Sequence, residues 1–306
     1  MSLRVSVIIP CHNEELSIGS VVSEFRKNLP TATIHVFDNL STDNTSKIAE
    51  SLGAIVHKVG LKGKGNVVRR MFADVEADVY VMADGDDTYD AAAVTTLIDE
   101  LLDHGLDMVV GARVAECATE AYRKGHRFGN AVLTNFVQWI FGGSFKDMLS
   151  GYRVFSRRFV KSFPAISSGF EIETELTVHA LELRCPCSEI DTRYGARPEG
   201  SSSKLATYRD GFKILTMIFR LYKHERPLEL YGLVAAAFAV TSIALAIPVF
   251  VWFLETGLVQ RLPTAVLSAS MMTVSIISLA CGLILATVTK GRNESKYLLI
   301  YLISGQ

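Results

Sequence analysis

The sequence predicts an α/β domain with a mostly parallel β-sheet, followed by two helices long enough to cross a membrane. Two observations predict the domain: short apolar stretches alternate with helical patterns, and polar clusters follow three of these stretches. A third observation predicts the membrane helices, because two long stretches near the end of the chain contain no charged residue.

The alternation begins at the start of the chain, where Arg4 to Pro10 predicts a strand, Glu14 to Asn28 a helix and Thr33 to Asp38 a second strand. It continues with a helix over Asp43 to Leu52, a strand over Ala54 to Val59, a helix over Gly65 to Val75, a strand over Val79 to Ala83, a helix over Ala91 to His104 and a strand over Met108 to Gly111. Sheets of this kind are covered by helices on both faces and bind ligands at the carboxyl ends of their strands.

Polar clusters stand at those strand ends. They are His12-Asn13-Glu14 after the first strand, Asp38-Asn39 after the second and Asp84-Gly85-Asp86-Asp87 after the fourth. Because the carboxyl ends of parallel strands meet at one edge, the clusters predict a single site.

The acidic cluster predicts a metal site. Asp84 and Asp86 flank a glycine, so the backbone can turn sharply and present both carboxylates to one hard cation, Mg²⁺ or Mn²⁺. A calcium loop is the sharper competitor, but its twelfth position, normally Glu, is Thr95, and its sixth, normally Gly, is Tyr89. A solvated acidic turn without function is the other alternative.

Two further residues suit a phosphorylated ligand. Lys64 lies in a Lys-Gly-Lys-Gly segment that opens a helix, where amides and a lysine meet anionic oxygen, although a plain turn fits equally. Asp38 is suited to accept hydrogen bonds from a base or ribose, and capping of the next helix is its alternative.

Composition limits the class of protein. The chain has 306 residues, and 32 acidic residues nearly balance 31 basic ones, so no global field attracts nucleic acid. The hydrophobic share of 49% and the mean hydropathy of +0.27 are high for a soluble protein. Five cysteines without paired spacing predict neither disulfides nor structural zinc.

The apolar excess lies in Tyr231 to Leu254 and Leu262 to Thr289, each longer than the roughly 20 residues that cross a bilayer. Basic residues flank the pair on its outer ends and are scarce in the short connector, which places the N-terminal domain in the cytoplasm. Two buried helices of a soluble core are the alternative. We expect a catalytic domain over residues 1–204, an amphipathic interfacial helix over 205–229 and a membrane hairpin with a short cytoplasmic tail over 230–306.

The interfacial helix is predicted from the spacing of its cations. Between Thr207 and Arg226, one narrow arc collects Arg209, Lys213, Arg220 and Lys223, while apolar residues project elsewhere. Such a helix lies in the headgroup layer of a membrane, unless it packs on the globular domain.

Nine sequence pieces together resemble one known family. In chain order they are VSVIIPCHNEE, VFDNLSTDNT, GLKGKGNVVRRMF, VMADGDDTYD, MVVGAR, HRFGN, DMLSGYRVFSRR, GFEIETEL and ARPEGSSSKLATYRDG. They cover most of Val5 to Arg209 and resemble the family 2 glycosyltransferases of GT-A fold, specifically the polyprenyl-phosphate sugar transferases related to dolichol-phosphate mannose synthase. The resemblance implies a Rossmann-like catalytic domain.

The resemblance also implies roles for individual residues. The nucleotide-sugar would meet Pro10, His12, Glu14, Asp38, Asn39, Lys64, Asp84 and Asp87. The metal would bind Asp84 and Asp86, and the lipid phosphate would meet Arg113, Arg127, Ser150, Arg153 and Lys204, with Arg127 and Arg153 also acting in catalysis. Three departures from the family pattern stand out. His12 replaces the common tyrosine of the first motif and Asn39 the common aspartate of the second, which leaves the identity of the nucleobase open. The glutamine that often supplies a third metal ligand aligns near Thr88, which leaves that ligand open.

The expected reaction is inverting transfer of a hexose from a nucleotide-sugar, UDP-hexose before GDP-mannose, to a membrane polyprenyl phosphate. The alternatives are a processive polysaccharide synthase, whose Q-x-x-R-W element is missing around Gln138-Trp139, transfer to a protein or diffusible acceptor, and a membrane scaffold that binds nucleotide-sugar without catalysis. The sequence leaves the oligomeric state open, a homo-oligomer included.

Overall fold

The computed structural model describes residues 3–115, 134–135, 137–139, 142, 145–198 and 207–304. The chain divides into two compact units, Met1–Met217 with Lys296–Gln306, and Ile218–Ser295. Two predicted site residues, Arg127 and Lys204, lie outside the described ranges.

The first unit is built on a seven-stranded sheet of order β3-β2-β1-β4-β6-β5-β7. Its strands are β1 (Val5–Cys11), β2 (Thr33–Asp38), β3 (Ile55–Lys58), β4 (Val79–Met82), β5 (Met108–Ala115), β6 (Arg153–Ser156) and β7 (Cys187–Tyr194). All neighbouring pairs are parallel except the two that involve β6, which runs antiparallel to β4 and β5. The prediction of a mostly parallel α/β sheet is confirmed.

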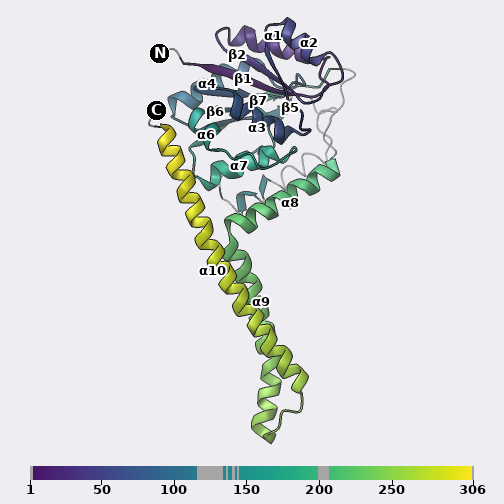
Figure 1. Cartoon of the computed structure of the whole chain (residues 1–306), viewed down its shortest axis with the longest axis vertical. Coiled ribbons are helices and arrows are strands. Elements are labelled where there is room, and N and C mark those ends of the chain that lie inside the picture. Colours follow the sequence, from purple (N-terminus) through teal and green to yellow (C-terminus); the bar gives the residue numbers. More distant parts are fainter. Residues whose placement is uncertain are drawn as a thin grey trace. The chain divides into compact units, whose positions relative to one another are not determined.

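Helices connect and cover these strands. They are α1 (Ile18–Asn28), α2 (Thr45–Ser51), α3 (Lys64–Asp74), the 3₁₀ turn η1 (Ala91–Ala93), α4 (Val94–Asp103), α6 (Arg157–Ser162) and α7 (Ile172–Glu182). The one predicted helix over Ala91 to His104 is therefore a 3₁₀ turn that leads into an α-helix, and Asp90 caps the turn by accepting a hydrogen bond from the amide of Ala92. Figure 1 shows the sheet between α1 and α2 on one side and α3, α6 and α7 on the other.

The core lies on both faces of the sheet because successive strand residues point to opposite sides. Along β1, Val7 and Ile9 join the cluster beneath α1 and α4, whereas Ile8 joins the cluster beneath α3, α6 and α7. Strand β4 alternates in the same way, and all four of its residues are buried. Two covered faces leave the carboxyl edge of the sheet as the place for ligands.

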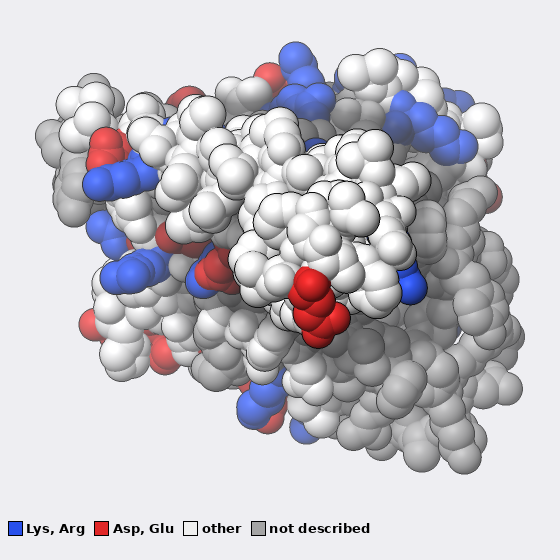
Figure 2. All heavy atoms as spheres, turned by 90° about the horizontal axis from the view of Figure 1, so that it is seen from below, with Lys and Arg blue, Asp and Glu red and all other residues white. Residues whose placement is uncertain are grey.

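The second unit contains a helical hairpin formed by α9 (Pro227–Thr256) and most of α10 (Leu262–Ser304). Both helices are long and apolar enough to cross a membrane, and most of their side chains are exposed to the surroundings. The near surface in Figure 2 is mainly uncharged. At 1.5 Å per residue, the 43 residues of α10 reach about 64 Å, so a bilayer core of about 30 Å accommodates only part of this helix.

Small residues seven positions apart hold the hairpin together. Ser242 and Ser268 exchange hydrogen bonds from hydroxyl to carbonyl oxygen, and the hydroxyl of Ser275 donates to the carbonyl of Ala235 at 2.7 Å. At the next heptad position Gly282 packs against α9, where an added Cβ would lie 3.0 Å from the Cβ of Tyr231. Close backbone approach at small residues is typical of helix pairs in membranes.

Helix α8 (Thr207–Glu225) has apolar residues on two faces. Ile214, Met217 and Ile218 are buried, while Phe212 and Phe219 are 71% and 57% exposed. Apolar residues thus occupy both an inner and an outer face of the helix. The outer aromatic residues remain consistent with a place at a membrane surface.

The apolar tail after Lys296 continues α10 and belongs to the first unit. The ammonium of Lys296 lies 3.1 Å from both carboxylate oxygens of Glu182 at the end of α7, and the hydroxyl of Tyr297 donates to the Glu182 carbonyl. These bonds give the tail a defined attachment to α7.

Candidate active site

The loop after β2 is fastened by its two polar residues. Asp38 accepts hydrogen bonds from the amide of Ser41 and the hydroxyl of Ser46, so its carboxylate also orders the start of α2. The side-chain amide of Asn39 donates to the carbonyls of Val59 and Leu61, and its oxygen accepts from the amide of Gly63. Asn39 therefore shapes the loop that leads into α3 and Lys64.

The residues after β1 lie beside this loop. Pro10 and His12 are partly buried, and Glu14 is 8% exposed. The amide of Glu14 donates to the hydroxyl of Thr45 at the first position of α2. The structure thus brings the ends of β1 and β2 together, as the sequence predicts for neighbouring parallel strands.

The acidic loop after β4 is packed tightly against β1 and α1. An added Cβ at Gly85 would lie 2.5 Å from the sulfur of Cys11, and the hydroxyl of Ser17 donates to the Gly85 carbonyl at 2.7 Å. Asp87 adopts a positive φ of 59° and is partly buried. Burial raises the pKa of Asp87, and the neighbouring charge of Asp86 raises it further.

Asp84 and Glu173, which are far apart in the sequence, both form ion pairs with the buried side chain of Lys64. The Nζ of Lys64 lies 2.5 Å from Oδ1 of Asp84 and 2.6 Å from Oε1 of Glu173, in the first turn of α7. Burial alone would lower the pKa of Lys64, but the two carboxylates raise it, so the ammonium is charged. Burial raises the pKa of Glu173, whereas the adjacent Lys64 ammonium lowers it and favours the ionised form, so the contact between Lys64 and Glu173 is an ion pair.

Asp86 forms an ion pair with a different cation, Arg197. Its Oδ2 lies 2.5 Å from Nη2 of Arg197, a residue that follows β7, and its Oδ1 accepts a hydrogen bond from the hydroxyl of Thr88. The side chain of Asp86 is 6% exposed and that of Arg197 is 27% exposed. Thr88 therefore supports Asp86 in this structure.

Arg113 stands at the same edge on β5. It forms a bidentate ion pair with Asp147, with distances of 2.6 and 2.7 Å, and its guanidinium lies 5.6 Å from the ring centre of Tyr194. Tyr194 stacks edge-on against Tyr89. Arg113 is thus held rigidly next to the acidic loop.

Two predicted lipid-phosphate residues lie in the interior. Arg153 is fully buried, and its guanidinium donates to the carbonyls of Met148, Ser150 and Glu173. Ser150 is also fully buried and donates to the carbonyl of Gly111. In this structure the polar atoms of both side chains are used within the fold, and their role as phosphate contacts stays a prediction. Arg153 joins the loop before β6 to the first turn of α7.

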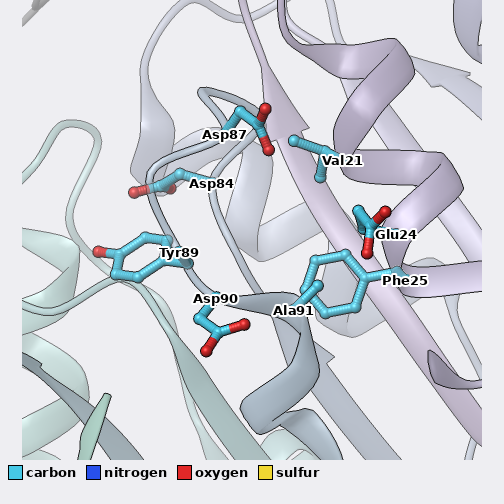
Figure 3. Close-up of a pocket in the computed structure, with 8 residues that line it drawn as sticks. All are labelled: Val21, Glu24, Phe25, Asp84, Asp87, Tyr89, Asp90 and Ala91. Atoms are coloured by element: carbon cyan, nitrogen blue, oxygen red, sulfur yellow. The ribbon is translucent and has the colours of Figure 1, made fainter. Parts of the chain in front are cut away.

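A hollow opens beside the acidic loop, between it and α1 (Figure 3). Asp84 and Tyr89 lie on one side of it, and Glu24 and Phe25 of α1 lie on the other. Tyr89 also accepts a hydrogen bond from the amide of Gly151 at 2.9 Å. Carboxylates and a phenol line this hollow.

A hard divalent cation fits the donor set of this loop. Two carboxylates, Asp84 and Asp86, present oxygen ligands, and Gly151 leaves space over one of them, since an added Cβ there would lie 2.6 Å from Oδ2 of Asp84. Among the described residues no group of three or more His, Cys, Asp or Glu side chains gathers around one point.

Glu173, Gly151 and Arg197 are site residues to which the sequence analysis gave no role. Glu173 stands in a helix whose nine residues from Ile172 to Ala180 are all buried. The burial of this helix is visible only in the fold, where it shows that the charge of Glu173 requires a partner.

Comparison with known proteins gives two kinds of similarity. The family model described as Glycosyl transferase family 2 matches residues 6–162. Glycosyltransferase AglJ of Haloferax volcanii is 36% identical over 244 residues, which cover 79% of this chain and 80% of AglJ. A dolichyl-phosphate hexose transferase of the same organism is 25% identical over 222 residues, covering 72% of this chain and 95% of that protein.

Among solved structures, glucosyl-3-phosphoglycerate synthase of Mycobacterium tuberculosis, in complex with Mn²⁺, UDP and glucosyl-3-phosphoglycerate, is similar with a TM-score of 0.59. The similarity covers 72% of this chain and 80% of that chain at 22% sequence identity. It identifies the same GT-A-like fold.

Proposed function

Because the chain belongs to glycosyl transferase family 2, we propose that it transfers a hexose from a nucleotide-sugar to a membrane polyprenyl phosphate with inversion at the anomeric carbon. A UDP-hexose is the first choice of donor and GDP-mannose the second. The product is a polyprenyl-phosphate sugar.

One observation carries this choice of acceptor. The same chain combines cation-paired carboxylates at the carboxyl edge of a parallel sheet with two exposed apolar helices of membrane-spanning length. A transferase for a diffusible acceptor has no need of such a hairpin. The dolichyl-phosphate hexose transferase, which aligns over 72% of this chain, supports a lipid phosphate as acceptor.

On the donor side, Asp84 and Asp86 would hold Mg²⁺ or Mn²⁺, which neutralises the charge that develops on the leaving diphosphate. Lys64 would supply a further positive charge at the start of α3, where helix amides also face the diphosphate. The remaining donor contacts are proposed for Pro10, His12, Glu14, Asp38, Asn39 and Asp87, which the structure places at the adjoining strand ends.

On the acceptor side, the nucleophile is already charged. The second pKa of a phosphate monoester is near 6, so the lipid phosphate is largely dianionic at neutral pH and needs no strong base. The task of the protein is to hold two polyanions in line, which suits cations. Arg113 at the sheet edge is proposed for this role, together with Arg127 and Lys204.

We further propose that the hairpin spans the membrane and that the catalytic unit lies in the cytoplasm, in accordance with the basic residues that flank the hairpin. In that arrangement the acceptor headgroup and the donor meet on the cytoplasmic side.

The test is direct. The full chain, purified in detergent, is incubated with polyprenyl phosphate, Mn²⁺ or Mg²⁺ and a panel of radiolabelled nucleotide-sugars, and lipid-soluble label is counted. Labelled lipid with one donor is expected. If the protein binds a donor but yields no labelled lipid with any donor, the result would support a binding scaffold and overturn the proposal that the protein is an enzyme.

Asp86→Asn tests the acidic cluster within the same assay. We expect transfer to fall about 100-fold or more while the melting temperature is retained, because the amide removes the charge that holds the metal. Asp103→Asn at the exposed end of α4 is the matched control and should transfer normally. Normal activity of Asp86→Asn at an unchanged metal optimum would show that the metal site is elsewhere.

A further inference from the structure

Lys64 is shared between two carboxylates that come from different parts of the chain. Asp84 belongs to the loop proposed to hold the metal, whereas Glu173 belongs to α7 and stands 5% exposed behind the lysine. The second oxygen of Glu173 has no hydrogen-bond partner among the described residues, and its carboxylate forms an ion pair with Lys64, while the charge of the buried Arg153 also acts on it. A buried carboxylate is costly to desolvate, which makes its presence informative.

The position of Glu173 is itself tightly fixed. Arg153 donates to its carbonyl at 3.1 Å, and the hydroxyl of Thr177, one turn later, donates to the same carbonyl. The start of α3 also lies directly against the segment that precedes α7, since an added Cβ at Gly65 would meet the carbonyl oxygen of Ser167 at 2.2 Å. Lys64 and Glu173 are therefore held next to each other by packing as well as by charge.

On the premise of the proposed function, we infer that Glu173 is a positioning residue. Through its ion pair with Lys64, it determines the affinity of the site for the metal relative to its affinity for metal-free diphosphate. When a divalent cation takes the carboxylate of Asp84, Lys64 loses one of its two partners and would be repelled by the new positive charge. Glu173 keeps the ammonium in place and offsets this repulsion. It thereby favours metal binding and, by the same negative charge, opposes a diphosphate that arrives without metal.

These two effects have opposite signs, and this distinguishes the inference from a purely structural role. Glu173→Gln should raise the dissociation constant for Mn²⁺ by about tenfold, because Lys64 would then pair with Asp84 alone and its charge would be uncompensated. The same variant should bind metal-free nucleoside diphosphate more tightly, by at least about threefold. Local damage to the fold would weaken both.

The experiment uses the full chain in detergent. Free Mn²⁺ is measured by electron paramagnetic resonance without nucleotide, and binding of radiolabelled UDP and GDP is measured by equilibrium dialysis in EDTA. Glu171→Gln is the matched control, because it removes the same charge two positions away on a side chain that bonds the amide of Gly169. Lys64→Gln should lower the dissociation constant for Mn²⁺ and raise that for metal-free nucleoside diphosphate. The double variant Lys64→Gln with Glu173→Gln should return the Mn²⁺ affinity towards that of the wild type.

Removing one partner of a buried ion pair can unfold a protein, so Glu173→Asp provides a second measurement. It keeps the charge but withdraws it by one methylene, and should shift both constants in the same opposed directions by a smaller factor. If the Glu173 variants match Glu171→Gln, or if both affinities move together, the inference is overturned while the proposed function stands. If the wild type binds neither Mn²⁺ nor nucleotide even when both are supplied together, the proposed function itself fails.

Discussion

Replacing Gly65 by alanine tests the packing that brings Lys64 to Glu173. The added Cβ would lie 2.2 Å from the carbonyl oxygen of Ser167 and 2.6 Å from its carbonyl carbon. Ordinary contact begins at 3.4 Å, so the two backbones would have to separate by about 1 Å. Overpacking of this kind costs about 1–3 kcal/mol, and the better helix propensity of alanine recovers at most about 1 kcal/mol.

The expected net loss of up to about 3 kcal/mol corresponds to a melting temperature up to about 12 °C lower for a domain of this size. Thermal unfolding in detergent, followed by tryptophan fluorescence, measures it. Gly60→Ala is the control, because an added Cβ at Gly60 has nothing within 4 Å. Sugar transfer by Gly65→Ala should also fall, since the separation moves Lys64 away from Glu173. A melting temperature and activity equal to those of Gly60→Ala would refute the close approach of α3 to this segment.

Two further predictions concern other parts of the chain. Ser275→Ala should lower the resistance of the hairpin to unfolding in SDS by about 0.5–1.5 kcal/mol, because it removes the bond to Ala235, whereas Ser270→Ala removes only a bond within its own helix and should not. His179, which packs edge-on against Phe159, should make the first unit less stable in acid, because burial lowers its pKa in the folded protein to about 3 from 6.5. Below pH 6.5 the unfolded chain therefore binds a proton that the folded chain does not. The free energy of unfolding should fall by about 2 kcal/mol at pH 5. Denaturant titrations at pH 7 and pH 5 measure this loss, and an equal loss in His179→Gln would assign it to another group.

The first half of the catalytic unit was predictable because its signals are local. The strand Thr33–Asp38 has the predicted bounds, and Val79–Met82 and Ile55–Lys58 lie within the predicted strands. Each is a short apolar stretch that ends in polar residues, which is typical of buried parallel strands. The convergence of their carboxyl ends then follows from the topology alone.

The second half lacks such signals. Strand β6 has only four residues, and its antiparallel place between β4 and β5 depends on pairing with distant segments. Helix α7 is buried over nine consecutive residues and therefore has no polar face to produce a helical period. Arg153 shows the same limit for a site residue: a cation within a motif suggests a ligand contact, but only the packing reveals that it bonds backbone carbonyls.

The net charge at the acidic loop depends on its own residues and on two cations from distant parts of the sequence, which contact it. Lys64 and Arg197 contact three carboxylates, so this cluster has a net charge of −1 in the structure, where a bare pair of aspartates beside Glu173 would have −3. A divalent ion alone therefore meets a weak attraction and two competing cations, and a diphosphate alone meets net repulsion. With both bound, the diphosphate would pair with Lys64 and Arg197, and Asp84 and Asp86 would be available to hold the metal. We accordingly expect Mn²⁺ and nucleoside diphosphate to raise each other's affinity by an equal factor, measured by Mn²⁺ titration with and without UDP or GDP, and independent binding of the two would contradict this view of the ion pairs.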